Sequence, residues 1–367
     1  MITGKATAEG TAAYAKKHGS LPAGHWRSAM GLTLSSVGLG TYLGNADPIT
    51  DGKYAAAALQ VMGGGVNVLD TAANYRYQRS ERNLGAGLKQ AIDQGLVARD
   101  QVVVCTKAGY IPGDWGPPTK EWFEATYVKP GLIKAGDVVS GGHVMTPAYL
   151  RHAVDQSRAN LGVETIDLYY VHNPEAQLEA RGVSEYYKRL TEAFRALEEC
   201  AAVGKISAYG TATWNAYRTP VGTTSAASLE RTLACAREAG GEKHRFRAIQ
   251  LPYNLGLPEA AFAQTQEKAD EIVSALDFAR DAGLAVFTSA SLMQGQLLGR
   301  FSTAMRGRFP GLDTDAQRCL QFARSTPGVT TALCGMKTPE HIVENLKTLS
   351  RAPFTPEEFE TLVGTMR

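Results

Sequence analysis

The sequence predicts an α/β protein folded as a (β/α)8 TIM barrel, a single domain with one long insertion after its third strand. Three observations support this prediction. Short apolar runs rich in β-branched and aromatic residues alternate with longer amphipathic stretches along most of the 367 residues. Eight such pairs are found, and eight parallel strands can close a sheet into a barrel. Ionisable residues end three successive runs, which would bring them together at one mouth of that barrel.

The predicted strands are short apolar runs, as expected of parallel strands buried on both faces. They span residues 37–41, 66–70, 102–107, 166–172, 206–211, 248–252, 285–289 and 331–335. The predicted helices between them span residues 54–62, 81–94, 147–161, 185–203, 228–239, 268–282, 315–324 and 339–348. Strict alternation indicates a parallel sheet with right-handed crossovers, and an open doubly wound sheet is the alternative arrangement of the same elements.

Two segments stand outside this alternation. Residues 1–25 are polar and lack a clear period, and we expect them to form an N-terminal extension to a barrel domain that spans residues 26–367. Residues 110–146 are rich in glycine, proline and aromatic residues, and connections of this length within a domain are usually functional or disordered. Because this insertion leaves the predicted mouth, it is either a lid or a wall of the substrate site, or else an insertion at the surface or at an oligomer contact.

The composition argues against several classes of function. With 44% hydrophobic residues, 20% charged residues and a formal net charge of +2, the chain has no basic run that would bind nucleic acid or an anionic membrane. Its five cysteines lack the spacing of a metal site, so we expect no metal and reduced thiols in a cytoplasmic protein. We find no signal peptide and no run long enough to span a membrane.

Four residues at or near the predicted strand ends form the candidate catalytic group. Asp70, Lys107 and His172 each close a strand, and Tyr75 follows Asp70 by five residues in the next loop. The pKa of a phenol is about 10 in water, and a nearby cation such as Lys107 lowers it. Asp70 can hold that cation, and His172 can hydrogen-bond a carbonyl oxygen. Tyr75 would then protonate this oxygen as hydride reaches the attached carbon, which requires a nicotinamide.

Several short stretches resemble the aldo-keto reductase family. They are Val37-Gly38-Leu39-Gly40-Thr41-Tyr42, Leu69-Asp70-Thr71-Ala72-Ala73-Asn74-Tyr75, Cys105-Thr106-Lys107, Tyr170-Val171-His172-Asn173-Pro174 and the tail from Gly335 to Leu346. The resemblance runs from about Trp26 to the C-terminus, excluding the long insertion. It is strongest to the bacterial branch akin to potassium-channel β-subunits.

The resemblance implies a TIM barrel, an NADP(H) cofactor and a role for each residue of the Asp-Tyr-Lys-His tetrad. Tyr75 is implied as the general acid or base, Lys107 and Asp70 as the groups that tune it, and His172 as the group that positions the substrate. The residues implied to bind the cofactor are Gly40, Thr41, Tyr42, Asp70, Thr213, Gln250, Ser289, Gln294, Gly295, Leu297, Gly335, Lys337, His341, Glu344 and Asn345. Among these, Lys337 and His341 would face a 2′-phosphate. Independently, Thr338-Pro339 is typical of a helix N-cap and first helical residue, which together favour an anion.

Three departures from the family pattern concern the cofactor. Ala212-Thr213 stands where the family usually has Ser-Asn, and Ser289 stands where it often has an aromatic residue that stacks on the nicotinamide. Gly335 occupies the family's strongest lysine position for the 2′-phosphate, two residues before Lys337. Loss of one amide hydrogen bond and of stacking would weaken nicotinamide binding by a few kcal/mol. Trp214 is a candidate substitute for the missing ring.

These observations favour an NADPH-dependent oxidoreductase that interconverts an alcohol and a small-molecule carbonyl compound (an aldehyde, a ketone or a sugar). One alternative is a redox-neutral lyase, dehydratase or epimerase that uses the same tetrad with weak or no nicotinamide binding, as the departures suggest. The other is a non-catalytic nucleotide-sensing subunit, against which the intact tetrad argues. A homo-oligomer is compatible with the sequence.

Overall fold

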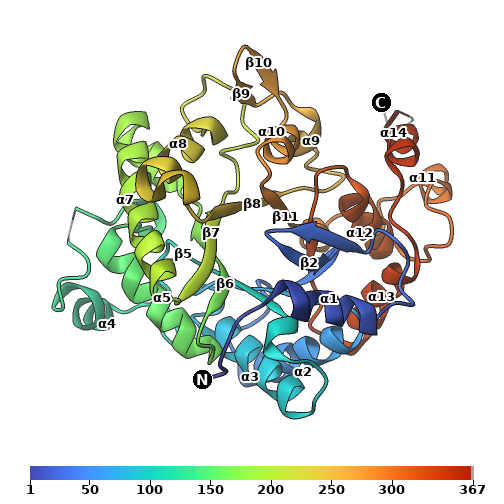
Figure 1. Ribbon diagram of the computed structural model, residues 1–367, viewed down its shortest axis with the longest axis horizontal. Helices are drawn as coiled ribbons and strands as arrows, with labels where there is room; N and C mark the ends of the chain where they lie inside the picture. The colour runs from blue at the N-terminus through green and yellow to red at the C-terminus, as the bar shows by residue number, and fades with distance from the viewer. Residues whose placement is uncertain (135, 365–367) are drawn as a thin grey trace.

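The computed structural model describes residues 1–134 and 136–364, and within them eight parallel strands form a closed barrel (Figure 1). The strands are β3 (Val37–Gly40), β4 (Val68–Asp70), β5 (Val103–Ala108), β6 (Ile166–His172), β7 (Ile206–Ala212), β8 (Phe246–Pro252), β11 (Ala285–Ser289) and β12 (Thr331–Gly335). They pair in chain order, and β12 pairs with β3 to close the sheet. The predicted barrel is thus confirmed, and the open-sheet alternative is wrong.

Helices surround the barrel and connect successive strands (Figure 1). The helices at the predicted positions are α2 (Pro48–Gly63), α3 (Arg79–Asp93), α5 (Pro147–Leu161), α7 (Val183–Ala202), α8 (Leu229–Gly240), α10 (Ala275–Asp281), α12 (Asp315–Ser325) and α13 (Pro339–Lys347). Their apolar faces follow the helical period; in α3, for example, Leu84, Leu88 and Ala91 are buried. Gly85 lets α3 approach α5 closely, because a Cβ there would lie 2.3 Å from the carbonyl oxygen of Leu161.

One predicted helix begins later than its pattern suggested. Residues 268–282 were expected to be helical throughout, but the structure has a hairpin, β9 (Gln266–Lys268) and β10 (Glu271–Val273), before α10 starts. Ala269 in the hairpin turn has a φ of 52°. Ser274 then caps the helix, because its side chain accepts a hydrogen bond from the backbone N–H of Asp277. The cap determines where the helix starts.

The N-terminal segment covers the end of the barrel opposite the mouth. Residues 1–25 contain α1 (Ala8–Lys17), in which Tyr14 is buried and donates a hydrogen bond to the carbonyl oxygen of Met62. A second hairpin, β1 (Trp26–Ala29) and β2 (Leu32–Ser35), follows, and its Met30-Gly31 turn has positive φ at both residues, as tight hairpins favour. Leu34 packs with side chains of the barrel interior. Neither α1 nor this hairpin was predicted from the sequence.

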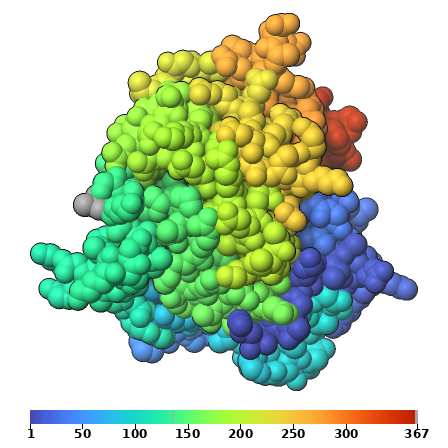
Figure 2. All heavy atoms as spheres, turned by 60° about the vertical axis from the view of Figure 1, so that its left-hand side comes forward, coloured from blue at the N-terminus to red at the C-terminus, as the bar shows by residue number. Residues whose placement is uncertain are grey.

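The described part of the insertion, residues 110–134 and 136–146, packs beside the barrel rather than across its mouth. Its helix α4 (Lys120–Phe123) lies at the outer edge of the molecule, and Figure 2 shows the segment as a lobe on the side wall. The lobe has its own aromatic cluster, in which Trp122 and Phe123 pack on Tyr127 and Tyr127 packs on Tyr149 of α5. These contacts give the long connection an ordered position against α5.

Short elements complete the fold. They are α6 (Glu175–Arg181), α9 (Glu259–Phe262), α11 (Thr303–Gly307), α14 (Pro356–Gly364), the 3-10 turns Arg99–Gln101, Ser140–Gly142, Gly241–Lys243, Met293–Gly295 and Thr348–Ser350, and the π-turn Glu124–Val128. In the part of the chain that the structure describes, no helix combines the length and the apolar character needed to cross a membrane.

Candidate active site

A cavity of about 620 Å³ opens at the mouth of the barrel, where the strands end. It contains most of the residues predicted to form the site: Gly40, Thr41, Tyr42, Asp70, Tyr75, His172, Thr213, Gln250, Ser289, Gln294, Gly295, Gly335, Lys337, His341, Glu344 and Asn345 all line it. Lys107 lies behind the wall, in contact with Asp70. Leu297 was predicted to bind the cofactor, but Leu298 lines the cavity in its place, because the loop turns at Gly295.

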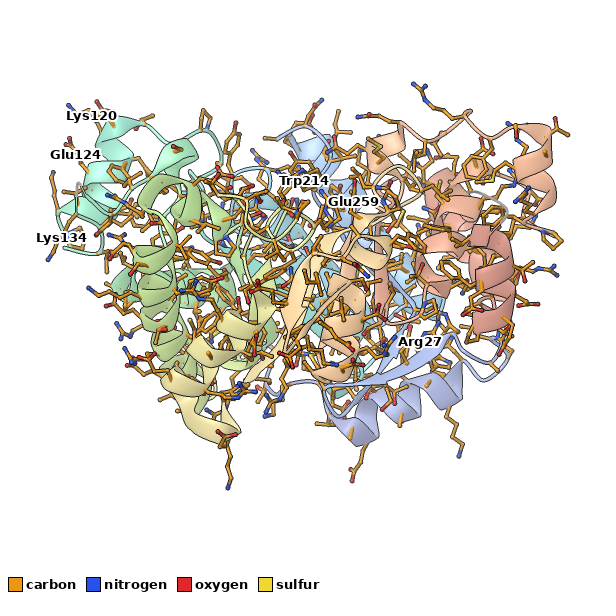
Figure 3. All side chains as sticks on the ribbon, turned by 90° about the horizontal axis from the view of Figure 1, so that it is seen from above. Arg27, Lys120, Glu124, Lys134, Trp214 and Glu259 are labelled. Carbon is orange, nitrogen blue, oxygen red and sulfur yellow. The ribbon has the colours of Figure 1, made fainter. Side chains whose placement is uncertain are left out.

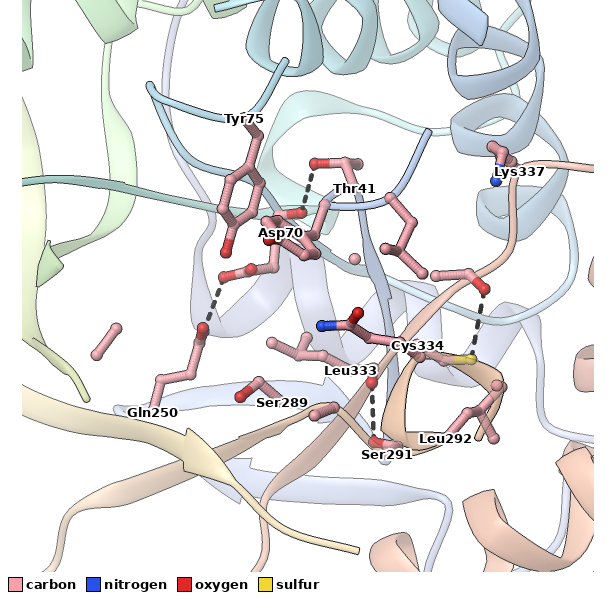
Figure 4. A pocket seen from close by; sticks show the side chains of 18 of the residues that line it. Thr41, Asp70, Tyr75, Gln250, Ser289, Ser291, Leu292, Leu333, Cys334 and Lys337 are labelled. Atoms are coloured by element: carbon pink, nitrogen blue, oxygen red, sulfur yellow. Dashed lines mark hydrogen bonds between the residues drawn. The ribbon is translucent and has the colours of Figure 1, made fainter. Parts of the chain in front are cut away.

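The structure brings three of the tetrad side chains into direct contact. Lys107 is fully buried, and its ammonium group donates hydrogen bonds to Asp70 Oδ1 at 2.5 Å and to the carbonyl oxygen of Thr71 at 2.6 Å. The same nitrogen lies 4.9 Å from the centre of the Tyr75 ring. Gln250 donates to the other oxygen of Asp70 at 2.9 Å, a contact visible in Figure 4. Both oxygens of Asp70 are therefore engaged, which fixes the position of Lys107 beside Tyr75.

Burial and charge act in opposite directions on these groups. Burial raises the pKa of Tyr75 above its ordinary value, and the Lys107 charge opposes this rise. Burial alone would lower the pKa of Lys107, but the adjacent Asp70 and Tyr75 outweigh it, so the pKa of Lys107 is raised. At neutral pH, Tyr75 is thus a protonated phenol beside a charged ammonium group, ready to donate its proton to an acceptor whose negative charge is developing.

His172 completes the tetrad as a neutral ring. Its imidazole packs edge-on against Tyr75, with 5.8 Å between ring centres. Burial lowers its pKa well below the ordinary value, and the Lys107 charge adds to this effect. A neutral imidazole carries one N–H donor. His172 can therefore donate one hydrogen bond to an oxygen in the cavity without adding a charge.

A strained turn holds Tyr75 in place. The three residues after it, Arg76, Tyr77 and Gln78, have φ values of 52°, 57° and 69°, in the left-handed region that non-glycine residues rarely occupy. Side-chain contacts keep them there: Arg76 forms an ion pair with Asp51 and Gln78 donates to the carbonyl oxygen of Gly113. Such strain persists only where the surroundings enforce it, and it is common at functional sites. No sequence signal predicted this turn.

The other end of the cavity is formed by β12, α13 and the loop after β11. Thr338 caps α13 by accepting from the N–H of His341, as predicted, and Lys337 lies just before this cap. Figure 4 shows Lys337 at one side of the cavity and Tyr75 at the other. Four residues that line the cavity have a buried polar atom with no hydrogen-bond partner among the described residues: Asn74 Oδ1, His172 Nδ1, Thr213 Oγ1 and Asn345 Oδ1. Atoms of this kind are free to bind a ligand.

The structure also locates two of the three departures from the family pattern. Ala212 pairs with His172 in the β6–β7 register and is buried, and Ser289 ends β11 at the cavity wall. The end of β11 therefore supplies no aromatic ring. Trp214, which follows Thr213, does line the cavity, and 43% of its surface is exposed.

The sequence did not predict several residues that line the cavity. They are Leu43, Tyr54, Asn74, Tyr110, Asn173, Ala290, Ser291, Leu292, Leu298, Ala316, Leu333 and Cys334, together with the departures Ala212 and Trp214 discussed above. Asn74 and Asn173 adjoin Tyr75 and His172, a proximity that could have identified them. Tyr110 is the one residue from the described part of the insertion that lines the cavity. Within the described residues, no group of three or more His, Cys, Asp or Glu side chains is arranged to hold a metal ion.

Comparisons with known proteins agree with this geometry. A model of the "Aldo/keto reductase family" matches residues 36–308. An "NADH-specific methylglyoxal reductase" from Escherichia coli K12 is 28% identical over 188 residues, which make up 49% of this chain and 49% of the relative. A "D-threo-aldose 1-dehydrogenase" from a Pseudomonas species is 30% identical over 188 residues, or 50% of this chain and 51% of the relative. The chain thus matches about half the length of these two curated relatives.

Solved structures share the fold at lower identity. An aldo/keto reductase from Klebsiella pneumoniae in complex with NADP and acetate has a TM-score of 0.59 at 20% identity, over 91% of this chain and 92% of that one. An aldo-keto reductase from Bacillus halodurans, in a holo form, has a TM-score of 0.62 at 19% identity, over 92% of this chain and 95% of that one. At these identities the likeness establishes the barrel alone.

Proposed function

The chain belongs to the aldo-keto reductase family, and from that premise we propose that it is an NADP(H)-dependent oxidoreductase that interconverts a carbonyl compound and an alcohol. The observation that carries this proposal is the contact among Asp70, Lys107 and Tyr75 on one wall of the cavity, with His172 packed against the tyrosine ring. No binding function requires a buried phenol held beside a buried ammonium group. General acid–base catalysis on an oxygen atom, in contrast, requires such an arrangement.

The residues of the cavity fit a nicotinamide dinucleotide. Thr213 Oγ1 and Asn345 Oδ1 are buried without a partner among the described residues, so each has hydrogen-bonding capacity for a ligand. The loop after β11 has positive φ at Ala290, Met293 and Gln294, a strained conformation suited to a binding loop. When bound, the reduced nicotinamide supplies the hydride, a group that no side chain can provide.

The tetrad residues would handle the proton. In the direction of reduction, the Tyr75 hydroxyl donates its proton to the carbonyl oxygen, and the electron pair of the broken O–H bond stays on the phenolate. Lys107 stabilises that phenolate, and Asp70 keeps Lys107 in position through the 2.5 Å contact. His172 orients the carbonyl through its single N–H donor. In the direction of oxidation, the phenolate of Tyr75 takes the proton from the alcohol.

Preference for NADP(H) over NAD(H) is supported by charge at the far end of the cavity. Lys337 and His341 line it there, beside the N-terminus of α13, where the positive end of the helix dipole favours a phosphate. The Klebsiella pneumoniae enzyme was crystallised with NADP and with NADPH. Because one relative is described as NADH-specific, the family name alone does not decide the cofactor.

A fluorescence titration with NADPH and with NADH tests this proposal. We expect tighter binding of NADPH, and Lys337→Met should weaken NADPH binding about tenfold while leaving NADH binding unchanged, since an ion pair with phosphate contributes about 1–2 kcal/mol. Lys347→Met is the matched control, because Lys347 lies at the other end of α13 and pairs with Asp313. Absence of binding by either nucleotide, together with no reduction of any carbonyl compound, would refute the proposal.

A second candidate is redox-neutral chemistry, such as that of a lyase, dehydratase or epimerase. It is favoured by Ser289, which leaves the end of β11 without a ring to stack on a nicotinamide. Substrate conversion that depends on Tyr75 but occurs without NADP(H), with no change in NADPH absorbance, would support this candidate over the first.

A further inference from the structure

The cavity is rich in aromatic rings around the tetrad. Tyr42 packs edge-on against Tyr75, with 5.0 Å between ring centres, and Tyr110 packs in the same way against His172 at 5.5 Å. Trp214 adds a fifth ring to the cavity wall. A small molecule whose carbonyl reaches Tyr75 would therefore lie against rings.

Apart from the Asp70–Lys107 ion pair, no described Asp, Glu, Lys or Arg residue contributes charge to the part of the cavity around the tetrad. Of the described Asp, Glu, Lys and Arg residues, those that line the cavity are Asp70, Lys337 and Glu344. Asp70 is already bonded to Lys107 and Gln250, and the other two belong to the end formed by β12 and α13. The one cation beside the tetrad among the described residues, the Lys107 ammonium group, is already bonded to Asp70 and to the carbonyl oxygen of Thr71, so it offers a charged substrate group no unpaired partner.

Two side chains, those of Glu175 and Arg218, bind the backbone of Trp214, one at its N–H group and the other at its carbonyl oxygen. The carboxylate oxygen Oε1 of Glu175 accepts hydrogen bonds from the backbone N–H of Trp214 at 2.5 Å and of Asn215 at 3.2 Å. From the other side, Nε of Arg218 donates to the carbonyl oxygen of Trp214 at 3.1 Å. Arg218 is in turn paired with Glu259 at 2.6 Å. Figure 3 shows Trp214 and Glu259 close together, and Arg27 of the β1 hairpin on the opposite side of the molecule.

The two side chains that bind the backbone of Trp214, those of Glu175 and Arg218, are themselves buried. Glu175 is 6% exposed and Arg218 is 8% exposed, and an ionic group is stable in such a position only when hydrogen bonds compensate for the lost water. For Glu175 the partners are the N–H groups of Trp214 and Asn215 at Oε1, while Oε2 has no partner among the described residues and burial raises the pKa of this carboxyl group. For Arg218 they are the Glu259 carboxylate and the carbonyl oxygen of Trp214. Trp214 lines the cavity and is 43% exposed, so its side chain is accessible to a ligand while its backbone is already fixed. Fixing a ring in advance lowers the entropy lost when a ligand packs on it.

We propose that Trp214 determines the specificity of this cavity for uncharged carbonyl compounds that carry an aromatic ring or another flat apolar group, and that Glu175 and Arg218 are the residues that position it. This inference rests on the proposed function, and it names the class of substrate for that same site. Glu175 and Arg218 act through Trp214 and do not touch the substrate.

Binding of unreactive amides tests the inference without turnover. Benzamide and butyramide are uncharged carbonyl compounds of similar size, and their affinities can be measured by calorimetry in the presence of NADP⁺. The wild-type protein should bind benzamide more tightly. Trp214→Ala should weaken benzamide binding about tenfold and butyramide binding less than about twofold, because the ring contact is lost for benzamide alone. Equal losses for both amides, or no loss for benzamide, would overturn the inference.

Variants of the positioning residue separate its role from general stability. Glu175→Ala should reduce the preference for benzamide about threefold, whereas Glu175→Gln should retain it, because the amide oxygen can still accept both N–H groups. Glu199→Ala is the matched control, since Glu199 pairs with Arg151 on the outside of the barrel. NADPH affinity should stay within about twofold in all three, because the N–H of Thr213 is bonded independently to the carbonyl oxygen of Gln250. If Glu175→Ala keeps the full preference, the positioning role is refuted.

Kinetics with benzaldehyde and butanal distinguish this inference from the proposed function. We expect Trp214→Ala to raise the KM for benzaldehyde about tenfold with little change in kcat. If no aldehyde is reduced by any form of the protein but benzamide binding depends on Trp214, the proposed function fails and the specificity inference stands. If both aldehydes are reduced and their ratio of kcat/KM is the same in Trp214→Ala, the specificity inference fails and the proposed function stands.

Discussion

Two buried ion pairs at opposite ends of the barrel show how one kind of contact can serve different purposes. At the closed end, Asp167 of β6 pairs with Arg99 at 2.7 Å. At the mouth, Asp70 of β4 pairs with Lys107 at 2.5 Å. All four side chains are buried, yet their surroundings differ.

The closed-end pair is surrounded by backbone. Asp167 also accepts hydrogen bonds from the N–H groups of Ala6 and Val104, and Arg99 donates to the carbonyl oxygens of Val102 and Thr165. The pair therefore joins the N-terminal segment to β5 and β6. Arginine suits this role because its guanidinium group is planar and always charged.

The pair at the mouth is surrounded by groups that can exchange a proton or meet a ligand. Its neighbours are the Tyr75 ring, the Gln250 amide and the cavity itself. Lysine suits this role because its compact ammonium group can approach a phenolate closely. The comparison teaches that the surroundings of a buried ion pair, more than its geometry, indicate whether it supports folding or chemistry.

The largest effect that would sharpen this comparison is expected from Tyr75→Phe. Removal of the hydroxyl removes the proposed general acid while leaving the ring packing in place, so kcat should fall about 10³-fold. NADPH affinity, measured by fluorescence titration, should change less than about twofold. Substantial activity in this variant would show that the mouth pair does not act through Tyr75.

The corresponding change at the closed end is Asp167→Ala. It leaves Arg99 buried without its carboxylate, and the free energy of unfolding should fall by about 3–5 kcal/mol in denaturant titrations. The kcat of the folded fraction should remain that of the wild type. A selective loss of kcat with unchanged stability would contradict the division of roles between the two ends.

One buried histidine near each end of the barrel allows the two ends to be compared through the pH dependence of the free energy of unfolding. Burial lowers the pKa of His25, near the closed end, and of His143, near the mouth, from 6.5 to about 4. Between pH 6.5 and pH 4, these two histidines therefore bind protons in the unfolded chain that they do not bind in the folded protein. The free energy of unfolding should therefore fall as pH decreases from 6.5 to 4, by about 2 kcal/mol per histidine at pH 5.

Denaturant titrations at pH 7 and pH 5 of His25→Gln and His143→Gln measure each contribution. Each variant should lose about half of the pH dependence that these two histidines produce together. If His25→Gln leaves the pH dependence unchanged, His25 is already protonated in the folded protein at pH 5, and its hydrogen bond to the Gly65 carbonyl oxygen then involves a charged ring.

The smallest expected effect comes from a matched pair of threonines. Thr213 at the mouth has a hydroxyl without a partner among the described residues, whereas Thr331 at the start of β12 donates to the carbonyl oxygen of Ser35. Thr331→Val should lower the free energy of unfolding by about 1 kcal/mol, and Thr213→Val should leave it unchanged or raise it slightly.

Measurements of ligand binding to Thr213→Val test the role of this threonine at the mouth. Thr213→Val should weaken NADPH binding about fivefold, the equivalent of one hydrogen bond, and leave the binding of adenosine 2′,5′-bisphosphate unchanged, because that fragment lacks the nicotinamide. Equal weakening of the binding of both ligands would contradict the assignment of Thr213 to the nicotinamide end of the cofactor.

Local patterns were sufficient for the barrel itself. β6, β11 and β12 begin and end at the predicted residues, because each is a short buried run rich in apolar, β-branched or aromatic residues. The same holds for α5, whose Pro147 and Gly162 mark its two ends. The helix predicted from residue 268 was wrong in its first half, because the alternation in the short strands of the hairpin is too brief to oppose a helical pattern.

In the candidate site, too, some features could be predicted from the sequence and others could not. The sequence alone determined which residue types close the strands, and therefore that Asp70, Lys107 and His172 meet at one mouth, because parallel strands in a barrel all end on the same side. Only the tertiary structure decided that the insertion packs beside the barrel, that Tyr75 sits on a left-handed turn, and that Glu175 and Arg218 hold Trp214. Apart from the contact of Arg218 with Trp214, which spans four residues, these features depend on contacts between residues far apart in the chain, and a local pattern carries no information about such partners.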